Sequence, residues 1–330
     1  QPVWPFPWRL SAWAFRDPDF RYEAVLAVTA VGCGWVIAIV GLVWRRIRWS
    51  ALVAAAIVVA AAVPHLDVLV VAAYPTSFVS SPSEFAATSI ARGERLFAQN
   101  CATCHGADAR GDGPASASLP VRPADLTAAH FLAHSDGELY WFIQHGFTAP
   151  DGATTMPGFA RSLSAEATWH LIDYLHAHAA GDAMRKTGRW PLPIPMPQFD
   201  AQCADGRMVD LDDLRGHILH IVALSDDETE HAPAEPNAVT IFVSRNADTQ
   251  PTGDSCIASE PQVWAALAVI IGTSTGSLAG TQLLVDHDGW LRATWRHGDP
   301  DDWTDPSVLE ATVRDIVAHP IVVTPITHHH

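Results

Sequence analysis

The residues Cys101-Ala102-Thr103-Cys104-His105 decide how the rest of this chain is interpreted. Two cysteines three positions apart, followed at once by a histidine, are the attachment signature of a c-type haem. Each thiol forms a thioether with one vinyl group of the porphyrin, and the turn between them places the imidazole under the iron. A zinc half-site is the alternative, but it needs a second ligand pair at similar spacing, and the sequence has no second Cys-x-x-Cys. The motif therefore predicts one covalent haem c per chain.

The sequence on both sides of this motif predicts helices that frame a cofactor. Residues 89–100 read as an amphipathic helix with Ser89 as its N-cap. Residues 165–178 read as a later helix that contains Tyr174. A Met-Pro-Gly-Phe loop beginning at Met156 lies between them.

In this order, the motifs resemble those of a class I monohaem cytochrome c, and the resemblance covers residues 86–182. It implies an all-α domain in which the first helix crosses the last, with Gly93 and Phe97 packed near Tyr174. It also implies His105 as one axial ligand of the iron, Met156 as the other, and the backbone carbonyl of Pro114 as acceptor for the ring N–H of His105.

The sixth ligand has competing readings, because a methionine such as Met156 also fills gaps in a core. The other candidates are Met184, Met196, His130, His134 and His145. The two methionines follow the last predicted helix, and the three histidines precede the Met-Pro-Gly-Phe loop. A Met/His pair raises the reduction potential relative to two nitrogen ligands, and such a haem passes single electrons with little room for a substrate.

Five further side chains are expected around the haem. Arg122 either pairs with a haem propionate or stays solvated. Tyr140, Trp141 and Phe142 are expected to line the haem cavity, and Trp169 is expected to face the core from the last helix.

The composition of the 330-residue chain allows two or three domains. Its formal net charge of −16 argues against nucleic acid as a partner. Hydrophobic residues make up 48% of the chain, and their concentration near the N-terminus predicts membrane segments.

Two apolar runs predict a two-helix membrane anchor at residues 23–75. The first, Ala24–Trp44, is long enough to cross a bilayer, and the second is Ala51–Val71. The connection at 45–48 contains three arginines, which places it on the cytoplasmic side. Both ends of the chain then face outward, and we expect the later domains on the periplasmic side of a bacterial inner membrane.

Residues 1–22 hold aromatic side chains among prolines. This composition suits either a membrane interface or a surface loop against a partner protein. Because the chain begins at Gln1, we expect either a removed signal or a further segment upstream.

The second apolar run also contains Pro64, His65 and Asp67. Ionisable groups inside a membrane indicate function, here a copper or quinol contact shared with another subunit. The other reading is a proline-bent helix end that frays into water. Together with the two helices, residues 73–82 resemble the end of copper-resistance D-type membrane proteins that carry a C-terminal cytochrome c. Those proteins have more helices, and this chain has no Met-rich or His-rich tract.

A proline-rich segment, 183–197, predicts a stiff linker, and a third domain occupies residues 198–320. Its expected strands and helices alternate, which predicts an α/β layer. The expected elements are strands at Gly206–Leu211, His217–Leu224 and Ala238–Ser244, a strand-turn-strand at Gln282–Ala293, and helices at Pro261–Ile271 and Asp305–Ala318.

This third domain resembles a thioredoxin-like domain of the peroxiredoxin type. The family's Cys-x-x-Cys would follow the strand that ends at Leu224, where residues 225–230 contain no cysteine. Gly280 stands where the family has a cis-proline, before Thr281. Without a thiol pair there is no dithiol chemistry, so we expect a docking or structural module.

Three cysteines remain outside the attachment motif, and Cys33 lies in the first apolar run. Because c-type cytochromes receive their haem outside the cytoplasmic membrane, the resemblance implies an oxidising compartment in which Cys203 and Cys256 can pair. The alternative is two free thiols. The terminal His328–His330 suggests part of a purification tag.

Together these features predict a multidomain, membrane-anchored c-type cytochrome. It would pass single electrons between a redox donor and an acceptor protein as a subunit of a larger membrane complex, without catalysis of its own. One alternative is a copper-handling membrane protein with an appended cytochrome. Another is a haem enzyme such as a peroxidase, which needs an open sixth position on the iron.

Overall fold

The computed structural model describes residues 8–10, 15, 18–66, 69–148, 154–190, 193–225, 236–251, 253 and 255–321. The chain divides into two compact units, Gln1–Val79 and Ser80–His330. Several residues singled out in the sequence lie outside the described residues: Asp67, residues 1–7 and 11–14 of the aromatic segment, 191–192 of the linker, 226–230 and the terminal histidines.

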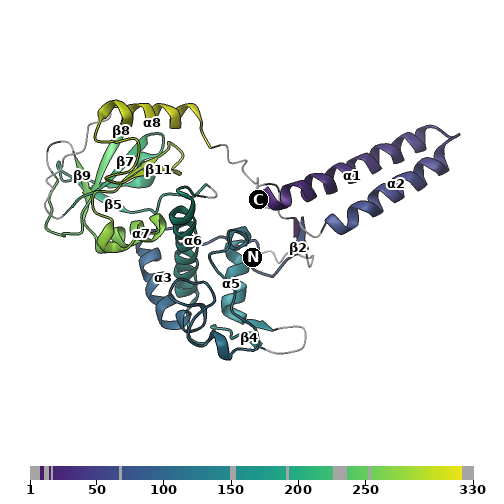
Figure 1. The fold of residues 1–330 in the computed structure, drawn as a ribbon, viewed down its shortest axis with the longest axis horizontal. Coiled ribbons are helices and arrows are strands. Elements are labelled where there is room, and N and C mark those ends of the chain that lie inside the picture. Colours follow the sequence, from purple (N-terminus) through teal and green to yellow (C-terminus); the bar gives the residue numbers. More distant parts are fainter. Residues whose placement is uncertain are drawn as a thin grey trace. The chain divides into compact units, whose positions relative to one another are not determined.

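The first unit is a helical hairpin, seen in Figure 1 as the pair α1 (Pro18–Val43) and α2 (Arg48–Ala62). The helices pack through small residues, since a Cβ on Gly41 would meet the side chain of Ala51 at 2.6 Å. Residues Arg21–Val43 and Arg48–His65 are long and apolar enough to span a bilayer, at 23 and 18 residues. At 1.5 Å per residue even the shorter one is about 27 Å long.

The second apolar run does not remain helical to Val71 as predicted. After Ala62 the chain forms one 3-10 turn, η2 (Val63–His65), and then a short strand, β2 (Val70–Ala72), which pairs with β1 (Trp8–Leu10). Proline lacks an N–H and clashes with the preceding helical turn, so Pro64 ends the helix. His65 therefore lies at a helix end, as the alternative reading expected.

The second unit begins with the predicted all-α domain. Its elements are α3 (Ala87–Asn100), α4 (Ala102–His105), η3 (Ser116–Ser118), η4 (Ala129–Ala133), α5 (Asp136–His145), the short strands β3 (Phe147–Thr148) and β4 (Thr154–Met156), and α6 (Ala165–Thr187). Helix α3 packs against α6, as predicted. A Cβ on Gly93 would collide with the carbonyl of His170, and the rings of Phe97 and Tyr174 lie 5.4 Å apart. The predicted crossing is confirmed.

Two predictions about these helices are wrong. Helix α3 begins after Ala86, which provides no side-chain cap, and Ser89 instead donates a 2.5 Å hydrogen bond to the buried Asp173. Helix α6 continues to Thr187 and ends at Gly188, whose φ is +72°. The expected boundary at 182 therefore falls inside a helix.

The rest of this unit is an α/β domain with one mixed sheet in the order β11-β10-β7-β8-β9-β5-β6. Strands β7, β8 and β9 are parallel, whereas β10 and β11 are antiparallel additions at one side. The order β8-β7-β10-β11 is that of a thioredoxin-like sheet. Its strands and helices are β5 (Asp200–Cys203), β6 (Met208–Asp210), η5 (Leu211–Leu214), β7 (Ile218–Ala223), β8 (Ala238–Val243), β9 (Cys256–Ala258), α7 (Pro261–Ile271), η6 (Thr275–Ser277), β10 (Gln282–Val285), β11 (Leu291–Trp295) and α8 (Pro306–Ala318).

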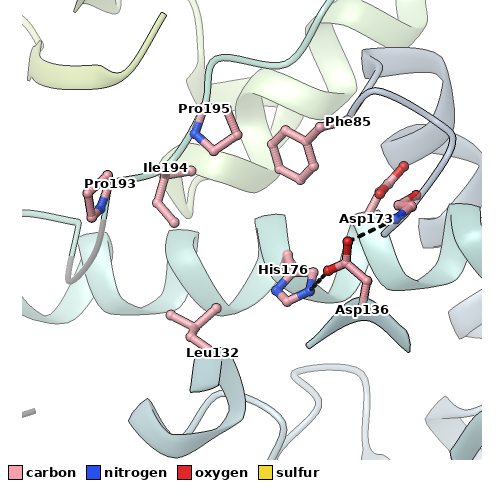
Figure 2. Close-up of a pocket in the computed structure, with 9 residues that line it drawn as sticks. Phe85, Leu132, Asp136, Asp173, His176, Pro193, Ile194 and Pro195 are labelled. Carbon is pink, nitrogen blue, oxygen red and sulfur yellow. Dashed lines mark hydrogen bonds and ion pairs between the residues drawn. The ribbon is translucent and has the colours of Figure 1, made fainter. Parts of the chain in front are cut away.

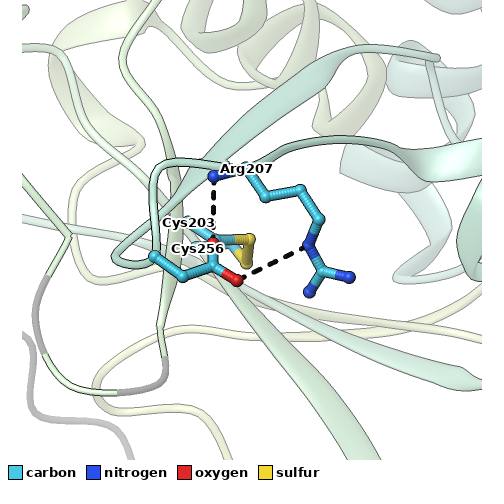
Figure 3. The surroundings of a disulfide bond; sticks show 4 residues. Cys203, Arg207 and Cys256 are labelled. Carbon is cyan, nitrogen blue, oxygen red and sulfur yellow. Dashed lines mark hydrogen bonds and ion pairs between the residues drawn. A yellow bond between two sulfur atoms is a disulfide. The ribbon is translucent and has the colours of Figure 1, made fainter.

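Most of the predicted elements of this domain are confirmed, including α7 over its full length. Strands β5 (four residues) and β9 (three residues) were not predicted. They hold Cys203 and Cys256 directly opposite each other in an antiparallel pair. A disulfide joins these two cysteines, as predicted (Figure 3). The backbone N–H of Cys203 also donates to the carbonyl of Arg207, at 2.8 Å, across the β5–β6 turn.

The proline-rich segment is not the free spacer that its composition predicts. Met196 N–H donates to Gly289 O, and Leu291 N–H to Ile194 O, each at 2.9 Å, so the segment lies on the sheet. Helix α7 packs against both α3 and α6, and Figure 1 shows the three helices together. The indole N–H of Trp190 donates to Ile270 O at 2.9 Å. The two domains of this unit are therefore docked.

Candidate haem site

The attachment motif folds as a single helical turn. His105 N–H donates to the carbonyl of Cys101 at 2.9 Å, so α4 carries both thiols and the imidazole within one turn. Cys101 and Cys104 are half-buried free thiols, whereas Cys203 and Cys256 are oxidised. Two free thiols one turn apart, followed by a histidine, are the donor set that a c-type haem requires. The residues present therefore fit that cofactor.

The ring of His105 is oriented by a backbone carbonyl. Its Nδ1 lies 3.0 Å from the oxygen of Ala124. Because a carbonyl only accepts, Nδ1 carries the proton and Nε2 carries the lone pair that binds a metal. The prediction that Pro114 supplies this carbonyl is wrong. Any residue can present a backbone oxygen, so the loop path, not the residue type, decides which one reaches the ring.

Burial shifts the pKa values of two of these groups. Burial lowers the pKa of His105, despite the opposing hydrogen bond to Ala124, so the imidazole is neutral at pH 7. Burial, together with the neighbouring Cys104, raises the pKa of Cys101 to about 12. That cysteine is therefore a thiol, not a thiolate, near neutral pH.

Met156 lies in the short hairpin β3–β4, opposite Phe147. The loop that follows is held against the end of α5, where Phe159 N–H donates to Ile143 O at 2.9 Å. Gly146 has φ +76°, and a Cβ there would collide with the carbonyl of Met156. The half-buried Met156 thus sits in a closely packed loop. Its role as sixth ligand stays a prediction.

The competing ligands occupy different surroundings. Met196 is 1% exposed in the segment that lies on the α/β sheet, and Met184 is in the extension of α6. His134 pairs with the buried Glu138 at 3.4 Å. His145 donates from Nδ1 to the carbonyl of Trp141 at 3.1 Å, which leaves its Nε2 as a possible donor to a metal. His145 therefore remains the main alternative to Met156. The last candidate ligand, His130, lies in η4.

Aromatic stacking organises α5. Tyr140 stacks on Trp169 with ring centroids 4.5 Å apart, and Trp141 stacks on His145 at 3.7 Å. Trp169 is 8% exposed, which confirms its predicted place in the core. The roles of Tyr140 and Trp141 at the haem stay predictions. Arg122 donates from Nε to Gly111 O at 3.2 Å, and its predicted pairing with a propionate is likewise untested by this contact.

A buried ion-pair cluster next to this site was missed in the sequence. The carboxylate of Asp182 is 2% exposed and contacts Arg110 at 2.9 Å, Lys186 at 2.5 Å, and Arg185. Burial raises its pKa, but the hydrogen bonds from Lys186, Arg110 and Arg185 outweigh burial and lower the pKa to about 2. The spacing of Asp182, Arg185 and Lys186 along one helix could have revealed part of the cluster. Nothing in the sequence brings in Arg110.

A cavity of about 340 Å³ lies between α5, α6 and the linker (Figure 2). Asp136 accepts from His176 at 3.1 Å and from the backbone of Ser81 at 3.0 Å. Burial raises the pKa of Asp173. At Asp136 burial also raises the pKa, but the hydrogen bond and charge of His176 together with backbone hydrogen bonds outweigh it, so the pKa of Asp136 is lowered. Phe85 and apolar linker residues complete the walls. Among the described residues, no three His, Cys, Asp or Glu side chains gather as they would around a metal ion.

Residues 88–175 match the family model for cytochrome c oxidase, cbb3-type, subunit III. A curated relative is the "Cbb3-type cytochrome c oxidase subunit CcoP" of Rubrivivax gelatinosus, 65% identical over 37 residues. That match covers 10% of this chain and 12% of the relative. The matched family residues include the attachment motif and its two crossing helices. Residues 88–175 accordingly resemble a cytochrome c domain of that family.

Two solved structures show local likeness to the chain. A reducing HAO-like protein complex of Kuenenia stuttgartiensis is 28% identical, with 26% of this chain and 42% of that chain covered and a TM-score of 0.23. The exposed lipoprotein thioredoxin Etrx1 of Streptococcus pneumoniae is 14% identical, with 36% and 98% covered and a TM-score of 0.26. With TM-scores this low, neither likeness bears on function.

Proposed function

We propose that this protein is a membrane-anchored electron-transfer cytochrome with one covalent haem c, and a subunit of a larger oxidase complex of the cbb3 type. The observation that carries the proposal is the single α4 turn, where two free thiols stand beside an imidazole already oriented by Ala124. The family match over residues 88–175 and the relative named as an oxidase subunit support the wider assignment.

Cys101 and Cys104 would hold the haem covalently, and His105 with Met156 would bind its iron. The haem, once bound, supplies one-electron transfer. The protein's part is to hold the two ligands so that the reorganisation on each transfer stays small. Phe147, 50% exposed beside Met156 in the hairpin, gives this edge an apolar surface that a redox partner can contact.

The two apolar helices support a membrane anchor, because Arg21–Val43 and Arg48–His65 each have the length to cross a bilayer. Arginines at 45, 46 and 48 favour a cytoplasmic location for their connection. The Cys203–Cys256 disulfide supports an oxidising compartment for the later domains. The proposed location is therefore the bacterial inner membrane, with the cytochrome and thioredoxin-like domains in the periplasm.

The decisive experiment is purification of the full chain from membranes in mild detergent. We expect haem that resists acid-acetone extraction at one per chain, together with co-purifying oxidase subunits that exchange electrons with it. A chain that carries haem but purifies alone and exchanges no electrons with the membrane oxidase would contradict the subunit assignment. Copper at one equivalent per chain would favour the copper-handling alternative instead.

The ligand set has its own test. A Met156→Ala variant is expected to lose the low-spin spectrum of the oxidised protein or to lower its reduction potential, since a thioether ligand raises the potential. Met184→Ala is the matched control and should change neither. If Met156→Ala leaves both unchanged and His145→Ala does not, His145 is the ligand.

A further inference from the structure

Asp182 is a buried carboxylate with no part in binding the haem directly, yet it is tied to the loop that orients the haem ligand. Its side chain is 2% exposed, and Arg110 reaches it at 2.9 Å across 72 positions of sequence. Lys186 and Arg185 pair with it from the next helical turn. A buried carboxylate needs partners that offset the loss of its hydration, and here one of the three cations, Arg110, comes from a distant loop.

Arg110 belongs to the loop that follows the attachment motif. Its neighbour Gly111 donates an N–H to the carbonyl of His105 at 2.8 Å and accepts from Arg122 Nε at 3.2 Å. Both residues that flank Arg110 have positive φ, +59° at Ala109 and +74° at Gly111. Such backbone needs support from its surroundings, and the Arg110–Asp182 pair supplies an anchor between the two positions.

The same loop fixes the carbonyl that orients the ligand. Ala109 O accepts from Leu126 N–H at 2.8 Å, which holds the segment two residues after Ala124. The oxygen of Ala124 in turn accepts from the ring of His105. A continuous set of contacts therefore runs from Asp182 through the loop to the imidazole.

The other side of Asp182 meets the thioredoxin-like domain. Gly181 makes backbone contact with α7, where a Cβ on it would collide with Val269 O and approach Gly272 N to 2.8 Å. Gly272 has φ +73° and ends α7. This close approach of two backbones holds the turn of α6 that carries Asp182.

We propose that Asp182 is a positioning residue for the haem ligand His105, and that the thioredoxin-like domain, through α7 and Gly181, fixes the helical turn from which it acts. The proposal rests on the proposed function, since it assumes haem c on α4. It gives the thioredoxin-like domain a role, which is to set the reduction potential of the neighbouring haem through structure. A hydrogen bond to the far nitrogen of a ligating histidine makes that ligand more basic and so favours oxidised iron. Loosening the hydrogen bond to His105 should therefore raise the reduction potential of the haem.

The test is a redox titration of the full holoprotein with Asp182→Asn. We expect the equilibrium constant for reduction to rise about tenfold, which is about 59 mV for a one-electron couple, and the iron–imidazole vibration to shift to lower frequency. Asp182→Glu should recover part of the change. Glu166→Gln is the matched control, because Glu166 is an exposed acid on the same helix that pairs with Arg92 at 3.6 Å. It should titrate like the parent.

A second variant keeps the proposal falsifiable if Asp182→Asn fails to fold. Gly181→Ala leaves the carboxylate in place but forces α7 away, so the potential should rise in the same direction. Gly276→Ala is its control, since a Cβ there meets only Ser274 Oγ at 3.9 Å. Holoprotein whose potential and vibration are unchanged in both test variants would overturn the proposal. A parent chain without covalent haem would instead overturn the proposed function.

Discussion

Two pairs of cysteines lie in one compact unit of this protein, and they have different fates. Cys101 and Cys104 are separated by one helical turn in the cytochrome domain and remain free thiols. Cys203 and Cys256 stand opposite each other on paired strands of the thioredoxin-like domain and form a disulfide. The local backbone makes the difference. A helical turn presents two thiols to a common third group, whereas opposed strand positions present them to each other.

The cysteine pair of the cytochrome domain gives the largest expected effect. Replacing Cys101 and Cys104 by serine should abolish covalent haem, because both thioether bonds are lost and only the ligands to the iron remain. Mass spectrometry of the denatured protein would show the parent with the added mass of haem and the variant without it. A variant that still retained covalent haem would contradict the assignment of Cys101 and Cys104 as the attachment cysteines.

The strand pair should affect stability and leave the haem alone. Replacing Cys203 and Cys256 by alanine removes a cross-link over a sequence separation of 53 residues. The chain-entropy model predicts a loss of about 4 kcal/mol of unfolding free energy, measurable by denaturant titration under oxidising conditions. Haem content should stay at that of the parent. Equal stability of the variant and the parent would show that the disulfide is only incidental to the fold.

A second comparison sets a glycine at a helix crossing, Gly93, against a glycine in open surroundings, Gly276. Gly93→Ala would place a Cβ against the carbonyl of His170 where α3 crosses α6. We expect a loss of about 1–3 kcal/mol from this overpacking, seen as a lower thermal midpoint. Gly276→Ala in the thioredoxin-like domain should leave the midpoint unchanged, because its surroundings are open. A neutral Gly93→Ala would mean that the crossing can widen without cost.

The smallest expected effect is the acid response of Asp182. Its folded pKa, about 2, lies below the ordinary value of 3.8, so its contribution to stability is complete above about pH 4 and disappears as the pH falls toward 2. Screening at the exposed cations limits this contribution to about 1 kcal/mol. Asp182→Asn should flatten the stability profile between those pH values, as measured by denaturant titration at each pH. An unchanged slope would assign the acid response to other carboxylates.

Local sequence patterns predicted the parts of this fold that depend on neighbours along the chain. The attachment motif and the full length of α7 follow from spacing and periodicity, and the crossing at Gly93 and Tyr174 follows from the family resemblance. The pairing of Cys203 with Cys256 was one of two readings, and it rested on the oxidising compartment that the resemblance implies. These signals work because each is contained in a few adjacent residues or in a family pattern.

Contacts made by backbone atoms or across long separations were not predictable. Ala124 orients His105 through a carbonyl that every residue type possesses. Ser89 looked like a helix cap because caps are recognised by residue type, yet its hydroxyl serves Asp173 from inside the helix. The linker prolines indicated an extended chain correctly, but not the sheet edge against which that chain lies. The partners of Ala124, Ser89 and the linker depend on how segments that are distant in the sequence pack together.

Helix α6 belongs to both domains of its unit, with its middle turns against α3 and its end against α7. During synthesis, the cytochrome sequence emerges well before residues 261–272 can cover that end. Domains emerging from the N-terminus usually fold first, but here the early domain keeps an uncovered helix until the late one arrives. The end of α6 near Gly181 is therefore covered only after α7 has been synthesised, so the packing of the cytochrome domain is completed by residues more than 80 positions later in the chain.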